Sequence, residues 1–164
     1  MNYIRLLFLS LVLVLGANMA VAQDTRVAFG NSKADTSAPV EVTAASLDVN
    51  QSDGSAEFTG DVLVVQGDMR LTANRVFVVY DRGQSRIARL EATGDVVLVS
   101  GQDAAEAERA DYSIDDGTIV MTGNVLLSQG ASALSSDRMT IELATGTARM
   151  AGRVKTILNS DGDN

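Results

Sequence analysis

Apolar and polar residues alternate along much of the chain, and the alternation recurs in three segments that each follow an arginine. The apolar positions are Val76, Val78 and Tyr80, then Ala110, Tyr112 and Ile114, then Met139, Ile141 and Leu143. Residues two apart in a β-strand lie on the same face, so these positions predict strands with a common buried face. Polar residues between them, such as Asp111 and Glu142, are predicted to face water. Phe77 and Val79 break the rule and predict a patch that a loop or a partner covers.

A second pattern gives the period of the repeat. Phe58-Thr59-Gly60-Asp61-Val62 is a Thr-Gly motif with further copies along the chain, and the glycines of the four copies are Gly60, Gly94, Gly123 and Gly152. Their spacings are 34, 29 and 29 residues. The arginines that precede the alternating segments and the turn glycines keep the same spacing, if five residues are inserted between Gly83 and Gly94. A fixed period of this size is typical of a repeat architecture.

The segments after each Thr-Gly motif are almost continuously apolar, at 62–65, 96–99 and 125–127. Such strands are covered on both faces or line a cavity on one of them, and glycine before them favours a β-bulge. Residues 104–110 have the composition of a helix. Arg109 nevertheless occupies the repeat position that begins a strand elsewhere, so we predict a strand there.

The first 22 residues have the features of a secretory leader. Arg5 is followed by the apolar run 6–15 and by Ala20-Val21-Ala22, which predicts cleavage before Gln23. The run is short for a bilayer span of about 20 residues; an uncleaved signal anchor is the alternative. With no cysteine to carry a lipid, we predict a secreted protein rather than a lipoprotein.

The remaining chain divides into three parts. Residues 23–38 are polar and aperiodic, which predicts a flexible lead-in, and Pro39 ends it. Residues 39–158 form the predicted β-domain, whose first strand begins at Val40. Residues 159–164 are Asn, Ser, Asp and Gly and are predicted to be disordered.

Charge and composition argue against several classes of function. Removing Arg5 with the leader leaves 12 basic against 21 acidic residues, a net charge of −9, which disfavours binding to nucleic acid or to anionic membrane. The chain has no histidine and no cysteine, so it lacks the commonest general base, the thiol nucleophile and the usual transition-metal ligands. We therefore predict that it is not an enzyme and holds no metal or cofactor.

One repeat concentrates basic side chains in this acidic protein. They are Arg70, Arg75, Arg82, Arg86 and Arg89. A hydrated face with neighbouring acids is one interpretation. A contact with phosphates or with an acidic partner is the other, since guanidinium groups suit phosphate.

The repeats and their flanking residues resemble the LptA/OstA family of periplasmic lipopolysaccharide transport proteins. The resemblance rests on residues 38–42, on Ser46-Leu47-Asp48, and on the motifs at 58–62 and 121–125 with Gln66-Gly67 and Gln129-Gly130 after them. It covers residues 38–158. The last copy departs from the motif, with Ala151 in place of Thr and Arg153 in place of Asp or Asn.

The resemblance implies an all-β fold, an incomplete, twisted β-jellyroll of antiparallel strands that is open at both ends. Its apolar interior is expected to hold the acyl chains of lipopolysaccharide. The resemblance also implies head-to-tail homo-oligomers, and partners of the same fold: an LptC-like protein at the inner membrane and an LptD-like protein at the outer membrane. The cleavable leader is similar to that of LptA rather than the anchored LptC.

We assign the lipid-binding role to the inward apolar positions and the oligomer contacts to the terminal strands. The candidate lipid-binding residues are Val40, Val42, Leu47, Val49, Phe58, Val62, Val64, Val76, Val78, Tyr112, Ile114, Val125, Leu127, Met139 and Ile141. The candidate oligomer edges are Val40 and Val42 at one end and Val154, Thr156 and Leu158 at the other. Burial of each acyl methylene contributes about 0.8 kcal/mol.

Two other functions fit the same pattern. A structural β-filament would use the repeats for stacking alone and would have a dry interior. A small polysaccharide-acting β-helix enzyme would need catalytic residues that this sequence lacks.

Overall fold

The computed structural model describes residues 25–30, 35–81 and 86–158. These residues form eleven strands: β1 (Thr25–Ala28), β2 (Glu41–Thr43), β3 (Ser46–Asn50), β4 (Ser55–Gln66), β5 (Met69–Tyr80), β6 (Ile87–Ser100), β7 (Asp103–Ser113), β8 (Thr118–Gln129), β9 (Ser132–Glu142), β10 (Thr147–Ala151) and β11 (Lys155–Leu158). Within these ranges no helix is long and apolar enough to cross a membrane. The predicted leader and tail, Arg82 and Gly83 lie outside the described residues.

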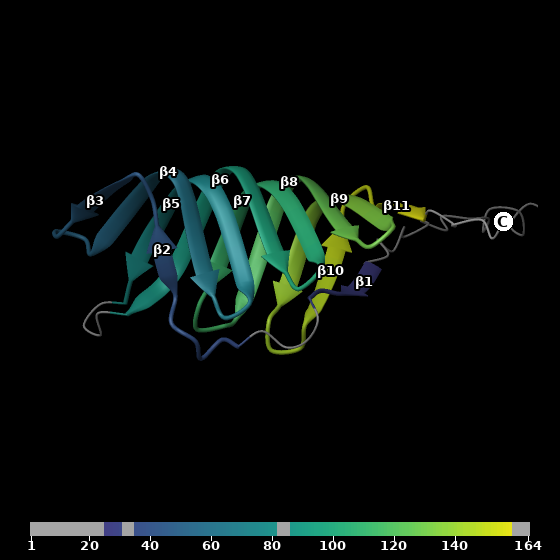
Figure 1. Cartoon of the computed structure of the whole chain (residues 1–164), viewed down its shortest axis with the longest axis horizontal. Coiled ribbons are helices and arrows are strands. Elements are labelled where there is room, and N and C mark those ends of the chain that lie inside the picture. Colours follow the sequence, from purple (N-terminus) through teal and green to yellow (C-terminus); the bar gives the residue numbers. More distant parts are fainter. Residues whose placement is uncertain (1–24, 31–34, 82–85, 159–164) are drawn as a thin grey trace, which may run out of the picture.

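All strands belong to one antiparallel sheet, in the order β1-β10-β9-β8-β7-β6-β5-β4-β2. The six long strands from β4 to β9 each pair with their neighbours in the chain, as a run of hairpins. Two short strands share the outer edge of each terminal long strand: β2 and β3 pair with β4, and β10 and β11 pair with β9. β3 and β11 mark the two ends of the long axis (Figure 1).

The register of the strands confirms the predicted repeat. The threonine of a Thr-Gly motif pairs with the arginine that begins the next alternating segment, as Thr59 does with Arg75 and Thr122 with Arg138. The Thr-Gly motifs and the arginines that begin the alternating segments therefore lie opposite each other on neighbouring strands. Residues 104–110 form part of β7, which confirms the strand predicted there.

Each Thr-Gly motif forms a β-bulge, where the pairing register shifts. The glycine and the next residue both have positive φ, for example 85° at Gly123 and 47° at Asn124. A Cβ atom at Gly123 would lie 2.8 Å from the Cβ of Glu108 on β7, so glycine is required both by its φ and by this close approach. A bulge bends the strand that carries it.

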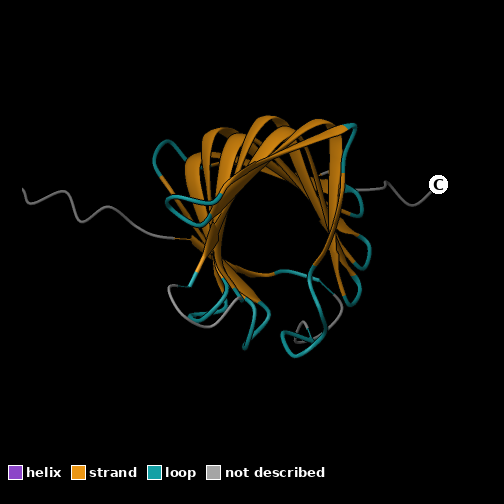
Figure 2. Cartoon of the chain, turned by 90° about the vertical axis from the view of Figure 1, so that its left-hand side faces the viewer, coloured by secondary structure: helices purple, strands orange, loops and turns teal. Residues whose placement is uncertain are grey.

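The bends give the long strands two halves that lie in different walls. The aliphatic wall consists of residues 62–66, 69–73, 96–100, 103–107, 125–129 and 132–136, and the charged wall of residues 55–59, 75–80, 87–93, 109–113, 118–122 and 138–142. The Tyr112 hydroxyl on the charged wall contacts the Gln66 side chain on the aliphatic wall, although β4 and β7 are not neighbours in the sheet. The walls therefore face each other, and the sheet forms an incomplete ring when viewed along its axis (Figure 2).

The inner faces of the two walls form a single hydrophobic core. Val64 and Leu98 of the aliphatic wall and Val78 and Ile141 of the charged wall all belong to one buried cluster. This arrangement confirms the predicted fold class, an unclosed and twisted antiparallel β-jellyroll.

The N-terminal part differs from the prediction. Thr25–Ala28, inside the predicted flexible lead-in, forms β1 and pairs with β10 along four residues. Thr25 and Val27 are more buried than Arg26 and Ala28, so this short segment alternates as a half-buried strand does. The strand predicted to begin at Val40 is β2, which begins at Glu41 and is the second strand in chain order.

The apolar segments after the bulges are covered on their inner face only. Val62 and Val64 are buried, whereas Leu63 and Val65 are half-exposed on the outer face. The same alternation occurs in β6 and β8, where Leu126 is 37% exposed. Coverage on both faces, one of the two alternatives for these segments, is therefore incomplete in the described residues, whose outer side chains are half-exposed. The other alternative, that the inner face lines a cavity, stays a prediction.

Candidate functional site

The interior of the jellyroll is mostly apolar, and Ser55, Gln66 and Ser136 are its buried polar residues. Residues from every long strand contribute to the buried cluster, and among the described residues no Asp, Glu, Lys or Arg is buried. Buried charges without partners are strongly unfavourable, so an interior of this kind suits hydrocarbon. The described residues contain no group of three or more His, Cys, Asp or Glu side chains that could hold a metal ion.

The candidate lipid-binding residues fall into three groups by burial. The buried ones are Val62, Val64, Val76, Val78, Tyr112, Val125, Leu127, Met139 and Ile141. The half-buried ones, which pack against this cluster, are Val40, Val42, Phe58 and Ile114. Leu47 and Val49 on β3 are 53% and 63% exposed. Their register places them beside Phe58 and Ala56, so they extend the inner face to the open end at β3.

Sequence reasoning assigned nine of the 27 buried apolar residues to the site. Inward residues that it did not assign include Leu71, Leu90, Val96, Leu98, Ile119, Met121, Leu134 and Met150. The alternation that found Val62 and Val64 applies equally to Val96 and Leu98, and cross-strand register applies to the rest, so the signal was present in the sequence. Seven alanines also lie in the buried cluster, for example Ala92 opposite Ala110.

A polar pair lies inside this apolar interior. The buried Tyr112 hydroxyl donates to Gln66 Oε1 at 2.6 Å, and burial raises the pKa of the tyrosine. Gln66 Nε2 donates to the carbonyl oxygens of Thr36 and Ala38, at 3.1 and 3.0 Å. Gln66 thus joins the two walls to the segment before β2. Within the described ranges, no buried side-chain nitrogen or oxygen lacks a partner.

Residues 25–30 and 35–40 lie along the line where the turns of the two walls approach each other. We call residues 25–30 and 35–40 the N-terminal strap, and this line the seam. In Figure 1 the strap follows the lower side of the molecule between β1 and β2. Its Phe29 is buried in the core cluster with 3% exposure, and the Phe29 amide donates to the carbonyl of Gly146 at 2.9 Å. Sequence reasoning did not assign Phe29, Gln66 or Gln129 to the site.

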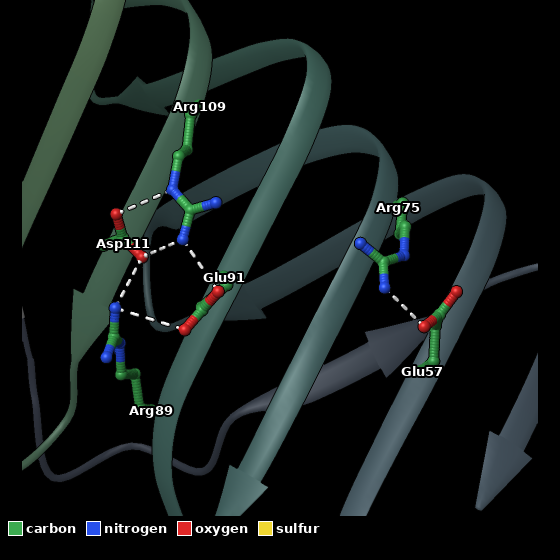
Figure 3. Close-up of polar contacts among 6 residues, drawn as sticks. All are labelled: Glu57, Arg75, Arg89, Glu91, Arg109 and Asp111. Atoms are coloured by element: carbon green, nitrogen blue, oxygen red, sulfur yellow. Dashed lines mark hydrogen bonds and ion pairs between the residues drawn. The ribbon is translucent and has the colours of Figure 1, made fainter.

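The outer face of the charged wall carries a network of ion pairs (Figure 3). Arg109 contacts Glu91 at 2.7 Å and Asp111 at 3.0 Å, and Arg89 contacts the same two acids. The hydrogen bond from Arg109 is the largest cause of a lowered pKa at Asp111, and the acids raise the pKa of Arg109. Arg75 contacts Glu57 at 2.6 Å and lowers the pKa of that carboxyl group.

These contacts account for most of the predicted basic cluster. Arg75, Arg86 and Arg89 pair with acids on neighbouring segments, with Arg86 2.7 Å from Asp115. Arg70 lies on the other wall, and Arg82 is outside the described residues. The interpretation as a hydrated, ion-paired face fits these residues better than a phosphate site.

Phe77 and Val79 are half-buried on the outer face of the charged wall. Phe77 helps to line a hollow of about 290 Å³ next to β3, together with Val49 and Glu57. Among the described residues no loop covers it fully, so the patch predicted there is partly exposed.

The candidate oligomer edges lie on terminal strands. Val42 belongs to β2 and Val40 precedes it, while Thr156 and Leu158 belong to β11 and Val154 precedes that strand. β2 and β11 each pair with one strand of the described sheet. β1 is a further terminal strand, next to β10, that the sequence did not indicate.

Comparison with known proteins identifies the family to which this fold belongs. Residues 41–147, more than half of the chain, match the family described as LptA/(LptD N-terminal domain) LPS transport protein. The chain belongs to this family. Membership confirms the resemblance to LptA/OstA proteins, and the matched residues extend from β2 to the first residue of β10.

Two individual proteins are similar to this chain, one in sequence and one in fold. An uncharacterized protein of Rhizobium meliloti (strain 1021) is 30% identical over 112 residues, which are 64% of this chain and 60% of that protein. The crystal structure of LptH, the LptA homologous periplasmic component of the lipopolysaccharide transport device of Pseudomonas aeruginosa, superimposes with a TM-score of 0.69. The superposition covers 77% of this chain and 99% of LptH at 16% identity, so it shows a shared fold.

Proposed function

We propose that the protein is a periplasmic lipopolysaccharide carrier that shields the acyl chains of its ligand in the interior of the jellyroll. Family membership supports the ligand class. The observation that carries the proposal is the interior itself, which is apolar from β4 to β10 and has no buried charge among the described residues. Displacing water from acyl chains along such a path contributes about 0.8 kcal/mol for each methylene group.

The entrance of this path is the β3 end. Leu47 and Val49 are exposed there on the same face as Phe58 and the buried core. Exposed apolar side chains at the rim give an acyl chain its first contacts, and Val40 and Val42 lie close by on the inner side of β2. The phosphorylated head group stays outside, where side chains are hydrated.

We further infer that the carrier bridges the inner and outer membranes by stacking end to end. Unpaired strand edges bind further strands by β-augmentation, and the two ends of this sheet carry opposite charges. Exposed Glu41 and Asp48 lie on β2 and β3, whereas Arg26 and Lys155 lie on β1 and β11. The partners are other copies of the chain, an LptC-like protein at the inner membrane and an LptD-like protein at the outer membrane.

Chemically trimmed ligands test whether acyl chains carry the binding. Purified protein is mixed with intact lipopolysaccharide, with dephosphorylated lipopolysaccharide, or with lipopolysaccharide whose acyl chains have been removed, and co-elution is measured by gel filtration. We expect co-elution with the first two and not with the third. Co-elution of the deacylated ligand at equal affinity would place recognition on the saccharide and contradict the proposal.

A structural filament is the second candidate, and one observation favours it. Val62, Val76, Val78 and Leu98 have 0% exposure, as they would in a permanently dry core. Folded protein that forms oligomers but captures none of the three ligands would support this candidate.

A further inference from the structure

The lipid-binding interior that we propose is closed along the seam, and the N-terminal strap contributes to the closure. Phe29 of the strap is buried in the same cluster as Ile141 and Met150, which line the interior. β1 pairs with β10 at the charged wall, and the Gln66 side chain holds Thr36 and Ala38 at the aliphatic wall. The strap therefore contacts both walls from the side on which the sheet is incomplete.

The contacts of the strap with the aliphatic wall repeat along the seam. Gln66 and Gln129 each precede a turn glycine, and each donates its amide to strap carbonyl oxygens; Gln129 Nε2 lies 2.8 Å from the oxygen of Ala28. The turn between these two lies against Gly30, whose amide donates to Asp103 Oδ2 at 2.8 Å. Three successive turns of the wall thus hold the strap in place.

The contacts that hold the strap are separable from those that hold the sheet. Strands β4 to β9 pair with each other without it, whereas the strap adds one four-residue pairing, one buried aromatic ring and a few side-chain hydrogen bonds. Cleavage before Gln23, as the sequence predicts, makes β1 the start of the mature chain. A terminal segment of this kind can detach while the core of the fold remains intact.

We propose that the N-terminal strap is a displaceable lid on the interior. It leaves the seam when acyl chains enter, and the place of the Phe29 ring passes to hydrocarbon of the ligand. The closed state explains why the apolar interior is shielded from water before a ligand arrives. This inference rests on the proposed lipid-carrier function, whose ligand it takes as given.

A reversible covalent lock tests the lid. A Cβ atom at Gly30 lies 3.2 Å from the Cβ of Ser100, close to the spacing of about 3.5–4.5 Å found in disulfides, and the chain has no other cysteine. In the double variant Gly30→Cys/Ser100→Cys, oxidation fixes the strap to the aliphatic wall beside Phe29. The reduced form of the same protein is the matched control, because it carries the same strain at the positive φ of position 30.

The lid predicts that oxidation lowers the apparent affinity for lipopolysaccharide by about tenfold or more, because it depopulates the binding-competent state. Reduction restores the affinity. Phe29→Ala, which weakens the closed state without a covalent lock, is expected to increase the rate of lipopolysaccharide uptake several-fold. Equal binding by the oxidised and reduced forms would overturn the lid and leave the carrier function standing. Failure of the unmodified protein to bind lipopolysaccharide would overturn both.

Discussion

After three of the four motif glycines, the next residue forms a polar pair with the neighbouring strand. Asn74 donates to Asp95 at 3.0 Å, Asn124 donates to Glu108 at 2.7 Å, and Arg153 donates to Asp137 at 3.0 Å. Arg153, which stands where the other motifs have Asp or Asn, also forms such a pair, with the acid Asp137. The departure from the motif at Arg153 is thus compensated within the sheet.

Substitution of a bulge glycine tests how much the close approach of the two strands at the bulge contributes to stability. In Gly123→Ala the new Cβ meets Glu108 at 2.8 Å and sits at a φ of 85°. We expect a loss of roughly 2–3 kcal/mol in the free energy of unfolding, since strain and a close contact add, measured by urea denaturation. Gly54→Ala is the control, with positive φ but no atom within 4 Å; an equal loss in both variants would contradict the role of the close approach.

The Tyr112 hydroxyl offers a second test at a single atom. Tyr112→Phe leaves the buried Gln66 Oε1 without its donor, which costs about 1–3 kcal/mol of stability. Urea denaturation of Tyr80→Phe, a half-buried tyrosine of the same wall, provides the comparison, and a change there within about 0.5 kcal/mol is expected. No difference between the two variants would show that the buried pair contributes nothing measurable.

Among the elements, the sheet is expected to depend on pH through its ion-paired carboxylates. Asp111 and Glu57 of the charged wall, and Asp137 next to it on β9, have lowered pKa values because each accepts hydrogen bonds from an arginine. A carboxyl group whose pKa is lower in the folded state stabilises the fold above its unfolded pKa. That stabilisation is lost as the pH falls through the folded value.

We therefore expect the free energy of unfolding to fall below about pH 4, the unfolded range of these groups. Asp111→Asn removes one of these contributions. The free energy of unfolding of this variant is expected to fall less between pH 7 and acid pH, by on the order of 0.5–1 kcal/mol, since the group is partly exposed to solvent. Denaturant titrations from pH 7 to pH 2 measure the effect. If the free energy of unfolding falls at acid pH as much in the variant as in the unmodified protein, the ion pairs of Asp111 do not stabilise the fold.

The sequence predicted the long elements well and the short ones poorly. Strands β4 to β9 carry the repeat, and the phase of that repeat outweighed helix propensity at 104–110, because register across a sheet is set by many residues together. β1 has four residues and no repeat neighbour, and it pairs with β10 across more than 100 residues of sequence. Single-strand alternation does not reveal such a distant pairing, and the strap escaped prediction for the same reason.

The sequence predicts that the inner face is apolar, but it does not predict the contacts between distant segments inside the sheet. Alternation assigned Val78 and Ile141 to the inner face, and both are buried there. Phe29 and the Gln66–Tyr112 pair are also buried, and the hydrogen bonds of Phe29 and of the Tyr112 hydroxyl join segments 46 or more residues apart. Local patterns carry no information about contacts of that kind.

For the whole molecule, end-to-end assembly makes a prediction about charge. Arg26 on β1 and Asp48 on β3 both face outward. The two strands lie at opposite ends of the sheet. Arg26→Asp and Asp48→Arg alone are each expected to raise the dissociation constant of self-association about threefold to tenfold, and together to restore it. Sedimentation velocity at low salt measures this. Single variants that assemble as the unmodified protein does would contradict charge-matched stacking.

The most direct test of the account asks whether lipid occupies the interior. A photo-crosslinking side chain at Ile141, buried on the inner face of β9, is compared with the same side chain at the neighbouring outward positions Thr140 and Glu142. After irradiation of living cells, adducts with lipopolysaccharide are detected by immunoblotting. The account predicts adducts at Ile141 and none at Thr140 or Glu142. Folded, oligomeric protein without adducts at any of the three positions would mean a dry core and contradict the carrier function.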